Sequence, residues 1–325
     1  MSENLNTTMN GTQSLSCFSN PTYSRKNGIT FVYCLIFLVS LPGNTVIGVI
    51  VYKAKAMRKP INFFIVTMAM SDLLFTLFFI PREIQLFYIN TWLIGGPLGQ
   101  ALCKLVILLS DVSFAVSIQS LVLIAVDRFG AVVFPLRSPL ITSKLCPFFI
   151  LATWMVAMAF FSPYLFVVKL VENPGGLACG LYWNEAFGGS SSFSYFIVAY
   201  MLVCNFIPLV LTAILYIIIY LKLKSHKIPG EHSVNAGQQH LQRERNVLKM
   251  AIAIVLGFAV CWMPNVMSVS IHVFGSDIMT KSCGFHFFSS VALFMLRANC
   301  AINPCICFNF SSNYRKELKT FLKCK

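Results

Sequence analysis

Charged side chains are scarce in this sequence. Only 11% of its 325 residues are Asp, Glu, Lys or Arg, and 11 residues are acidic. A soluble domain normally carries about 25% charged residues, so a string of soluble domains explains this chain poorly. The mean hydropathy of +0.74 instead indicates a helical protein that crosses a membrane several times.

Several signatures of other protein classes are also missing. No stretch resembles a catalytic triad, a phosphate-binding loop or a metal-ligand helix, which argues against an enzyme. No cysteine has zinc-ligand spacing with a histidine. We find no internal repeat of the kind typical of transporters, so a transporter is the weaker alternative. Residues 1–28 are polar and lack the apolar core of a cleavable signal peptide.

The basic residues are unevenly placed. The net charge is +14, and 18 of the 25 Lys and Arg residues fall in the segments 53–59, 128–144, 222–249 and 315–325. These segments alternate with apolar spans, which is the pattern of positive charge on the cytosolic side of a membrane. Such clusters attract anionic lipid, and this placement argues against nucleic acid as a partner.

The apolar spans predict an all-α membrane protein with seven transmembrane helices. We expect them at residues 29–52, 61–88, 103–128, 145–168, 193–223, 245–274 and 284–308. The domain plan is an extracellular tail (1–28), a seven-helix domain (29–308), and an amphipathic cytoplasmic helix with the C-terminal tail (309–325). The segments 166–172 and 178–183 flank the turn signal of residues 173–176, which predicts an extracellular β-hairpin.

The third span organises the bundle. A helix from Cys103 to Arg128 is about 37 Å long, which exceeds a hydrocarbon core of about 30 Å. Cys103 is therefore expected at one membrane face, and the Asp127–Arg128 pair at the other.

Two modifications are indicated in the tails. Asn6 and Asn10 lie in glycosylation sequons, which favours an extracellular N-terminus on the plasma membrane. Cys324 follows the amphipathic helix and is a candidate for palmitoylation, with an unmodified thiol as the alternative.

Ionisable residues inside the spans are functional candidates, because charge within a bilayer is costly. Asp72 falls in the middle of the second span. Glu83, Asp111 and Arg297 fall in the outer halves of their spans, and their formal sum of −1 favours a cationic ligand. The alternative is an internal ion pair of Arg297 with Glu83 or with Asp111.

Every span carries a motif that resembles the rhodopsin-like (class A) G-protein-coupled receptors. These motifs are Gly43-Asn44, Ser71-Asp72, Cys103 with Asp127-Arg128-Phe129, Trp154, Pro208, Cys261-Trp262-Met263-Pro264 and Asn303-Pro304. The resemblance implies a receptor that binds an extracellular ligand and activates a heterotrimeric G protein by outward movement of the sixth span. Arrestin and a receptor kinase are further implied partners.

The resemblance assigns a switch to the inner half of the chain. Arg128 would be latched by Asp127 and Glu244, while the Pro264 kink beside Phe258 and Trp262 would let the sixth span pivot. The remaining coupling and switch residues are Pro135, Leu136, Tyr216, Pro304 and Cys307. Cys307 stands where the family has a tyrosine that meets Tyr216, so a largely constitutive receptor is one alternative.

Two further sites follow from the resemblance. Cys103 and Cys179 are expected to form a disulfide, and a second bridge between Cys17 and Cys283 is as plausible as two free thiols. No cofactor is expected apart from an allosteric sodium ion at Asp72. The residues expected to supply its other oxygens are Asn44, Ser117, Asn299 and Asn303.

The ligand is inferred mainly by exclusion. The family's monoamine receptors have an aspartate where Ser110 stands, and its opsins have a lysine where Arg297 stands. The predicted hairpin and the short third inner loop look like neuropeptide receptors, with a small organic or lipid ligand as the alternative. Besides the ionisable residues, the expected ligand-binding residues are Ser110, Trp262, Asn265 and Val269.

Overall fold

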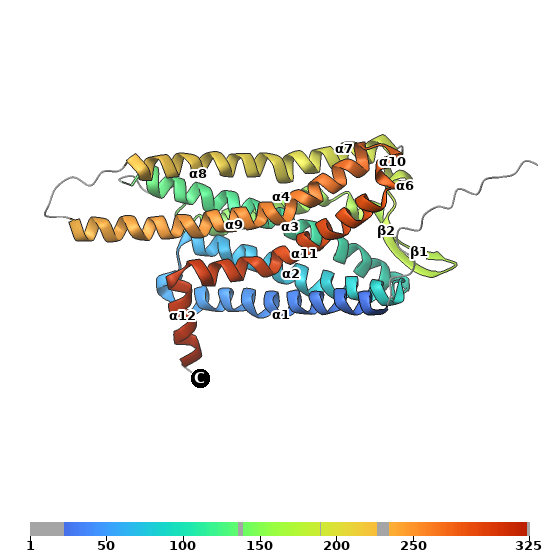
Figure 1. Cartoon of the computed structure of the whole chain (residues 1–325), viewed down its shortest axis with the longest axis horizontal. Coiled ribbons are helices and arrows are strands. Elements are labelled where there is room, and N and C mark those ends of the chain that lie inside the picture. The colour runs from blue at the N-terminus through green and yellow to red at the C-terminus, as the bar shows by residue number, and fades with distance from the viewer. Residues whose placement is uncertain (1–22, 136–138, 189, 226–233, 324–325) are drawn as a thin grey trace, which may run out of the picture.

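The computed structural model describes residues 23–135, 139–188, 190–225 and 234–323. Its long helices run side by side as one bundle (Figure 1). They are α1 (Tyr23–Lys53), α2 (Pro60–Ile89), α3 (Gly96–Val133), α4 (Cys146–Phe161), the consecutive segments α7 (Ser190–Tyr200), η2 (Met201–Phe206) and α8 (Ile207–Ser225), then α9 (Val234–Phe274) and α11 (Cys283–Phe310).

Short elements connect these helices. They are η1 (Lys55–Met57), α5 (Tyr164–Val167), β1 (Val168–Asn173), β2 (Gly176–Leu181), α6 (Trp183–Phe187), α10 (Asp277–Thr280) and the terminal α12 (Ser312–Lys323). The hairpin and α12 lie at opposite ends of the bundle, and α12 turns away from the direction of the long helices (Figure 1).

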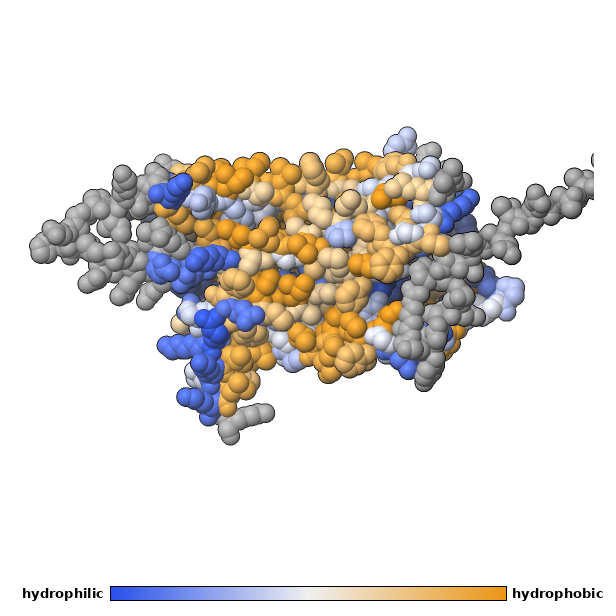
Figure 2. Space-filling model, viewed as in Figure 1, coloured by the Kyte–Doolittle hydropathy of each residue, from blue (hydrophilic) through white to orange (hydrophobic). Residues whose placement is uncertain are grey.

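Six helices in the described part of the chain are long and apolar enough to cross a membrane, and α4 is a shorter apolar helix. On the face shown in Figure 2, hydrophobic side chains cover the middle of the bundle, and hydrophilic side chains lie toward its ends. This distribution fits a bundle whose sides face lipid. The expectation of an all-α transmembrane bundle is confirmed.

The fourth span corrects one expectation. A continuous helix over 145–168 is wrong, because α4 ends at Phe161 and α5 begins only at Tyr164. Pro163 has no N–H, so it cannot donate to the Ala159 carbonyl as an α-helix requires. That carbonyl instead accepts from the Ser162 N–H at 3.3 Å.

The fifth span also departs from a regular α-helix, because η2 is a π-helical turn. Pro208 follows it and lacks the N–H that would bond the Cys204 carbonyl. Within the widened turn, Asn205 Nδ2 donates to the Tyr200 carbonyl at 3.3 Å. The Asn205 side chain thus bonds a backbone carbonyl where the regular α-helical hydrogen-bond pattern is interrupted.

The third span is the centre of the fold. α3 packs against α2, α4, α8 and β1. Its buried side chains enter both apolar cores, with Ile118 and Leu121 in one and Val112 and Val116 in the other. The expected central position of this helix is confirmed.

The predicted hairpin is also present. β1 and β2 pair antiparallel with Leu170 opposite Cys179, and Gly176 has a φ of 116° that favours glycine at the turn. Gln100 of α3 holds β1 through its side chain, which donates to the Val168 carbonyl at 3.1 Å and accepts from the Leu170 N–H at 2.7 Å. The hairpin is therefore attached to the outer end of α3.

α12 is amphipathic, with one apolar and one basic side (Figure 2). Tyr314 is fully buried against the bundle, and its hydroxyl donates to Asn62 Oδ1 of α2 at 3.3 Å. Lys53 Nζ lies 5.0 Å from the centre of the Phe321 ring. These contacts fix α12 at the end of the bundle where the basic residues gather.

Candidate functional site

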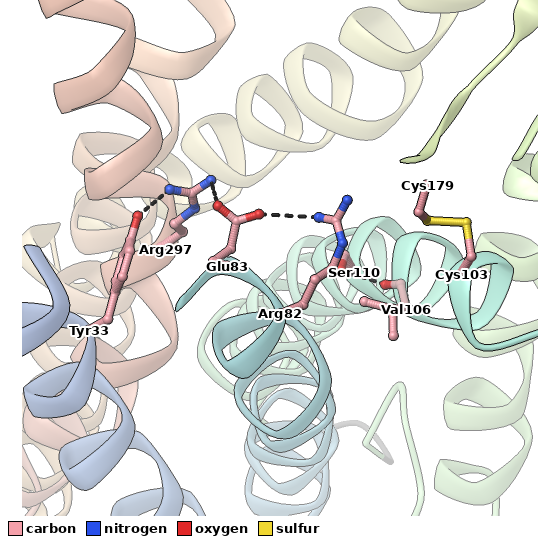
Figure 3. A network of polar contacts seen from close by, with 8 residues as sticks. All are labelled: Tyr33, Arg82, Glu83, Cys103, Val106, Ser110, Cys179 and Arg297. Atoms are coloured by element: carbon pink, nitrogen blue, oxygen red, sulfur yellow. Dashed lines mark hydrogen bonds and ion pairs between the residues drawn. A yellow bond between two sulfur atoms is a disulfide. The ribbon is translucent and has the colours of Figure 1, made fainter. Parts of the chain in front are cut away.

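A network of charged side chains joins three helices in the outer half of the bundle (Figure 3). Glu83 of α2 forms ion pairs with Arg297 of α11 and, at 3.2 Å, with its neighbour Arg82. Arg297 also donates to the Tyr33 hydroxyl of α1. Of the two internal pairs expected for Arg297, the structure forms the one with Glu83.

Aromatic rings lie against this network. The Arg297 guanidinium carbon is 5.5 Å from the ring centres of both Tyr33 and Phe79, and that of Arg82 is 5.8 Å from Phe79. These are cation–π contacts, in which a guanidinium lies over the face of an aromatic ring. We refer below to Arg82, Glu83 and Arg297 as the outer charge cluster.

Asp111 belongs to a different neighbourhood. Its carboxyl group lies near the Tyr164 phenol of α5. Ser110 is buried, and its hydroxyl donates to the Val106 carbonyl of its own helix at 2.7 Å. Asp111 does not join the ion pairs of Glu83 and Arg297, so its expected role in ligand binding stays a prediction.

The expected sum of −1 counted Glu83, Asp111 and Arg297, and the structure adds Arg82 to this group. With Arg82 included, the charges of Arg82, Glu83, Asp111 and Arg297 sum to zero. The signal was available in the sequence, since Arg82 is an ionisable residue in the outer half of a span. Tyr33 and Tyr164 were missed as well, because a tyrosine in an apolar span gives no comparable signal.

An aromatic stack lies below the outer charge cluster. Trp262 is stacked on Phe258 with ring centres 5.2 Å apart, and it meets Phe114 of α3 edge-on at 4.5 Å. Asn265 is buried on the next turn of α9, and Val269 is half-buried one turn further out. Pro264 lies within α9, between Trp262 and Asn265 in the sequence.

The middle of the bundle holds a polar group around Asp72. Asn303 Nδ2 donates to Asp72 Oδ2 at 2.8 Å, and the hydroxyls of Ser117 and Ser71 are 2.8 Å apart. Asn44 Nδ2 donates to the Cys300 carbonyl of α11 at 2.9 Å. These bonds join α1, α2, α3 and α11.

Three amide oxygens in this group have no hydrogen-bond partner among the described residues. They are Oδ1 of Asn44, Asn299 and Asn303, and all three side chains are buried. Uncharged oxygens beside one carboxylate are the donor set that a hard monovalent cation takes. The residues present therefore fit a sodium ion.

The inner end of α3 carries the second charged pair. Arg128 Nη2 donates to Asp127 Oδ2 at 2.5 Å, and Arg128 Nε donates to the same oxygen at 3.1 Å. Tyr216 of α8 is buried, and its hydroxyl has no hydrogen-bond partner among the described residues. This arrangement restrains the Arg128 side chain at the end of its own helix.

The remaining switch residues are placed as follows. Pro304 and Cys307 are buried in α11, and Pro135 is exposed after α3. Leu136 and the side chain of Glu244 lie outside the described part of the chain.

The disulfide between Cys103 and Cys179 is confirmed, with sulfurs 2.03 Å apart. It joins α3 to β2 (Figure 3). Cys283 is also disulfide-bonded. Cys17, Asn6, Asn10 and Cys324 lie outside the described residues, so their modifications and the second bridge stay predictions.

The bundle, the hairpin tied to α3 and the charged pair at the inner end of α3 define a seven-helix receptor. Residues 43–306 match the model of the family described as "7 transmembrane receptor (rhodopsin family)", and the chain belongs to this family. The expected class A G-protein-coupled receptor is thereby confirmed.

Among its curated relatives are three peptide receptors. A QRFP-like peptide receptor of Branchiostoma floridae is 31% identical over 301 residues, which cover 90% of this chain and 77% of that protein. The human substance-K receptor is 29% identical over 96% of this chain and 77% of its own length. The RYamide receptor of Drosophila melanogaster is 31% identical over 73% of this chain and 51% of its own length.

Proposed function

We propose that this chain is a plasma-membrane receptor that binds an extracellular peptide with its outer half and activates a heterotrimeric G protein with its inner end. The observation that carries the peptide ligand is the likeness to three peptide receptors over most of this chain. The N-terminus would face outside, and the basic end of the bundle with α12 would face the cytosol.

The side chains support a mechanism along α9. A ligand in the outer half would reach Asn265 and Val269, which lie on the same helix as the Trp262–Phe258 stack. Pro264 removes one backbone hydrogen bond, so α9 can bend there at low cost. Bending would move the inner half of α9 away from Arg128, whose guanidinium would then leave Asp127 and meet the G protein.

We also propose that Asp72 binds sodium, with oxygens from Asn44, Ser117, Asn299 and Asn303 and the ion acting as an allosteric stabiliser. Arrestin, a receptor kinase and membrane lipid beside α12 are proposed partners. Glycosylation at Asn6 and Asn10, palmitoylation at Cys324 and a Cys17–Cys283 bridge complete the proposal. The family and the relatives are receptors, and we assign no enzymatic role.

A largely constitutive receptor is the second candidate. It is favoured by Cys307, which lacks the phenol that could reach the unpartnered Tyr216 hydroxyl. In a constitutive receptor, the inner half would adopt its active conformation with little dependence on the ligand.

The test is G-protein activation in cells that express the full chain, screened against a peptide library. A peptide response that is lost in Arg128→Ala and kept in Arg58→Ala would support the proposal; Arg58 is a second inner arginine, bonded to the Tyr52 carbonyl at 2.6 Å. High basal signalling without any peptide response would favour the second candidate. Surface expression without either signal would contradict both.

A further inference from the structure

The outer charge cluster carries an uncompensated positive charge. Two guanidiniums, Arg82 and Arg297, share the single carboxylate of Glu83, which leaves a net charge of +1. The side chains are only 14%, 15% and 17% exposed, in the order Arg82, Arg297 and Glu83. A net charge held among helices in this way is costly unless an opposite charge joins it.

Three other acidic residues of the outer half have described side chains, and none of them pairs with the cluster. Asp111 lies near Tyr164 and has no ion pair with either arginine of the cluster, and Glu185 pairs with Lys169 at 2.7 Å. Glu172 is exposed on the hairpin. Among the side chains that the structure describes, the cluster therefore has a net charge of +1.

The hydrogen-bonding groups of the cluster also favour an anionic ligand, because its acceptors are engaged and some of its donors are not. Both oxygens of Glu83 are engaged, Oε1 by Arg82 and Oε2 by Arg297, so a cationic ligand would have to share this carboxylate with two guanidiniums. Arg82 Nε has no hydrogen-bond partner among the described residues. A guanidinium presents five N–H donors in one plane, and Arg82 meets Glu83 through Nη1 alone.

We propose that the outer charge cluster recognises a carboxylate of the ligand, with Arg82 as its main contact and Arg297 as the second. This inference rests on the proposed ligand site, and it replaces the sequence-based expectation of a cationic ligand. The carboxylate would accept from the unused edge of Arg82, a planar donor fork that suits carboxylates better than an ammonium does. Glu83 then acts as an internal competitor that holds both arginines in place until the ligand arrives.

The test uses a matched pair of small probes, so that it does not require the natural ligand. Purified full-length receptor is heated in detergent with increasing N-acetyl-L-phenylalaninate or with the uncharged N-acetyl-L-phenylalaninamide. Ligands that bind only the folded state raise the midpoint of unfolding. We expect the acid to act at roughly tenfold lower concentration than the amide.

Three variants assign the effect to the cluster. Arg82→Gln should abolish the preference for the acid, and Glu83→Gln should increase it, because the internal competitor is gone. Lys104→Gln is the matched control, since it removes one positive charge from the outer half of α3, where Lys104 Nζ donates to the Leu165 carbonyl at 2.6 Å. Equal action of both probes on the wild type, no action of either, or a preference that survives Arg82→Gln would overturn the proposal.

The activities of modified peptides show which carboxylate of the ligand is recognised. Each library peptide is made with a free C-terminus and as an amide, and each acidic peptide also with Asn or Gln in place of Asp or Glu. Loss of activity on amidation assigns the C-terminal carboxylate, and loss on neutralising a side chain assigns that side chain. If no peptide activates the receptor, the proposed peptide function fails, while the probe titration still decides on the cluster.

Discussion

Gly43 of α1 packs directly against Pro304 of α11. A Cβ added to Gly43 would lie 2.7 Å from the Pro304 Cβ and 2.8 Å from its Cγ, which is closer than real side chains pack. The glycine therefore allows the two helices to approach beside the Asp72 group, where Asn44 bonds the Cys300 carbonyl.

Gly43→Ala should destabilise the receptor by about 1–3 kcal/mol, because overpacking must push α1 away from Pro304. Gly48→Ala is the matched control on the same helix, since nothing lies within 4 Å of its added Cβ. There alanine should add about 0.5–1 kcal/mol of stability. Thermal unfolding of both variants checks the pair, and a stable Gly43→Ala would contradict the close contact.

Tyr314→Phe should weaken the attachment of α12 to α2. Burial raises the pKa of the Tyr314 phenol well above its usual range, so the hydroxyl stays protonated and donates to Asn62. Its removal leaves Asn62 Oδ1 without that donor, at a cost of about 1–3 kcal/mol. Tyr220→Phe changes an exposed tyrosine and should shift stability by less than about 0.5 kcal/mol. Similar unfolding midpoints for the two variants would argue that the Asn62 bond contributes nothing.

Asp72→Asn should remove the response of the receptor to sodium. The wild type is expected to unfold at a higher temperature in sodium chloride than in choline chloride of equal concentration, because an ion bound only by the folded state stabilises it. The variant should show equal midpoints in the two salts, and Glu185→Gln, which neutralises an exposed carboxylate, should behave as the wild type. A sodium effect that persists without the Asp72 charge would exclude this site.

Cys103→Ala should detach β2 from α3 and lower stability by about 2–4 kcal/mol, the usual contribution of a disulfide. Cys305→Ala, at an exposed free cysteine, is the control. Because Gln100 holds β1 independently, Gln100→Ala should add to the loss seen in Cys103→Ala. Unfolding midpoints of the single and double variants, with surface expression, measure both anchors.

Much of the architecture was predictable from hydropathy and turn signals. Long apolar runs show where a helix is in lipid, and the residues 173–176 mark the hairpin turn. Hydropathy does not show how far a helix extends into water. For this reason the expected start at residue 245 was too late, since α9 begins at Val234. The backbone hydrogen bonds of a helix continue beyond the bilayer regardless of side-chain polarity.

The partners of the charged residues were less predictable. The sequence placed Glu83 and Arg297 in the outer halves of their spans, and this shared depth in the membrane made an ion pair between them one of the predicted alternatives. It did not show that Arg82 reaches the same carboxylate or that Asp111 turns to Tyr164, because both depend on the rotation of a helix within the bundle. The break at Pro163 had a signal in the sequence, since proline interrupts the ladder, but proline in other helices here does not end them.

The π-helical turn at Met201–Phe206 makes this stretch tolerant of a change in chain length. One residue deleted within the turn would let it close into a regular helix, with the residues on both sides still facing their present neighbours. The same deletion elsewhere in the fifth span would rotate every following side chain by about 100°. The loss of a single codon is therefore survivable at this turn and damaging on either side of it.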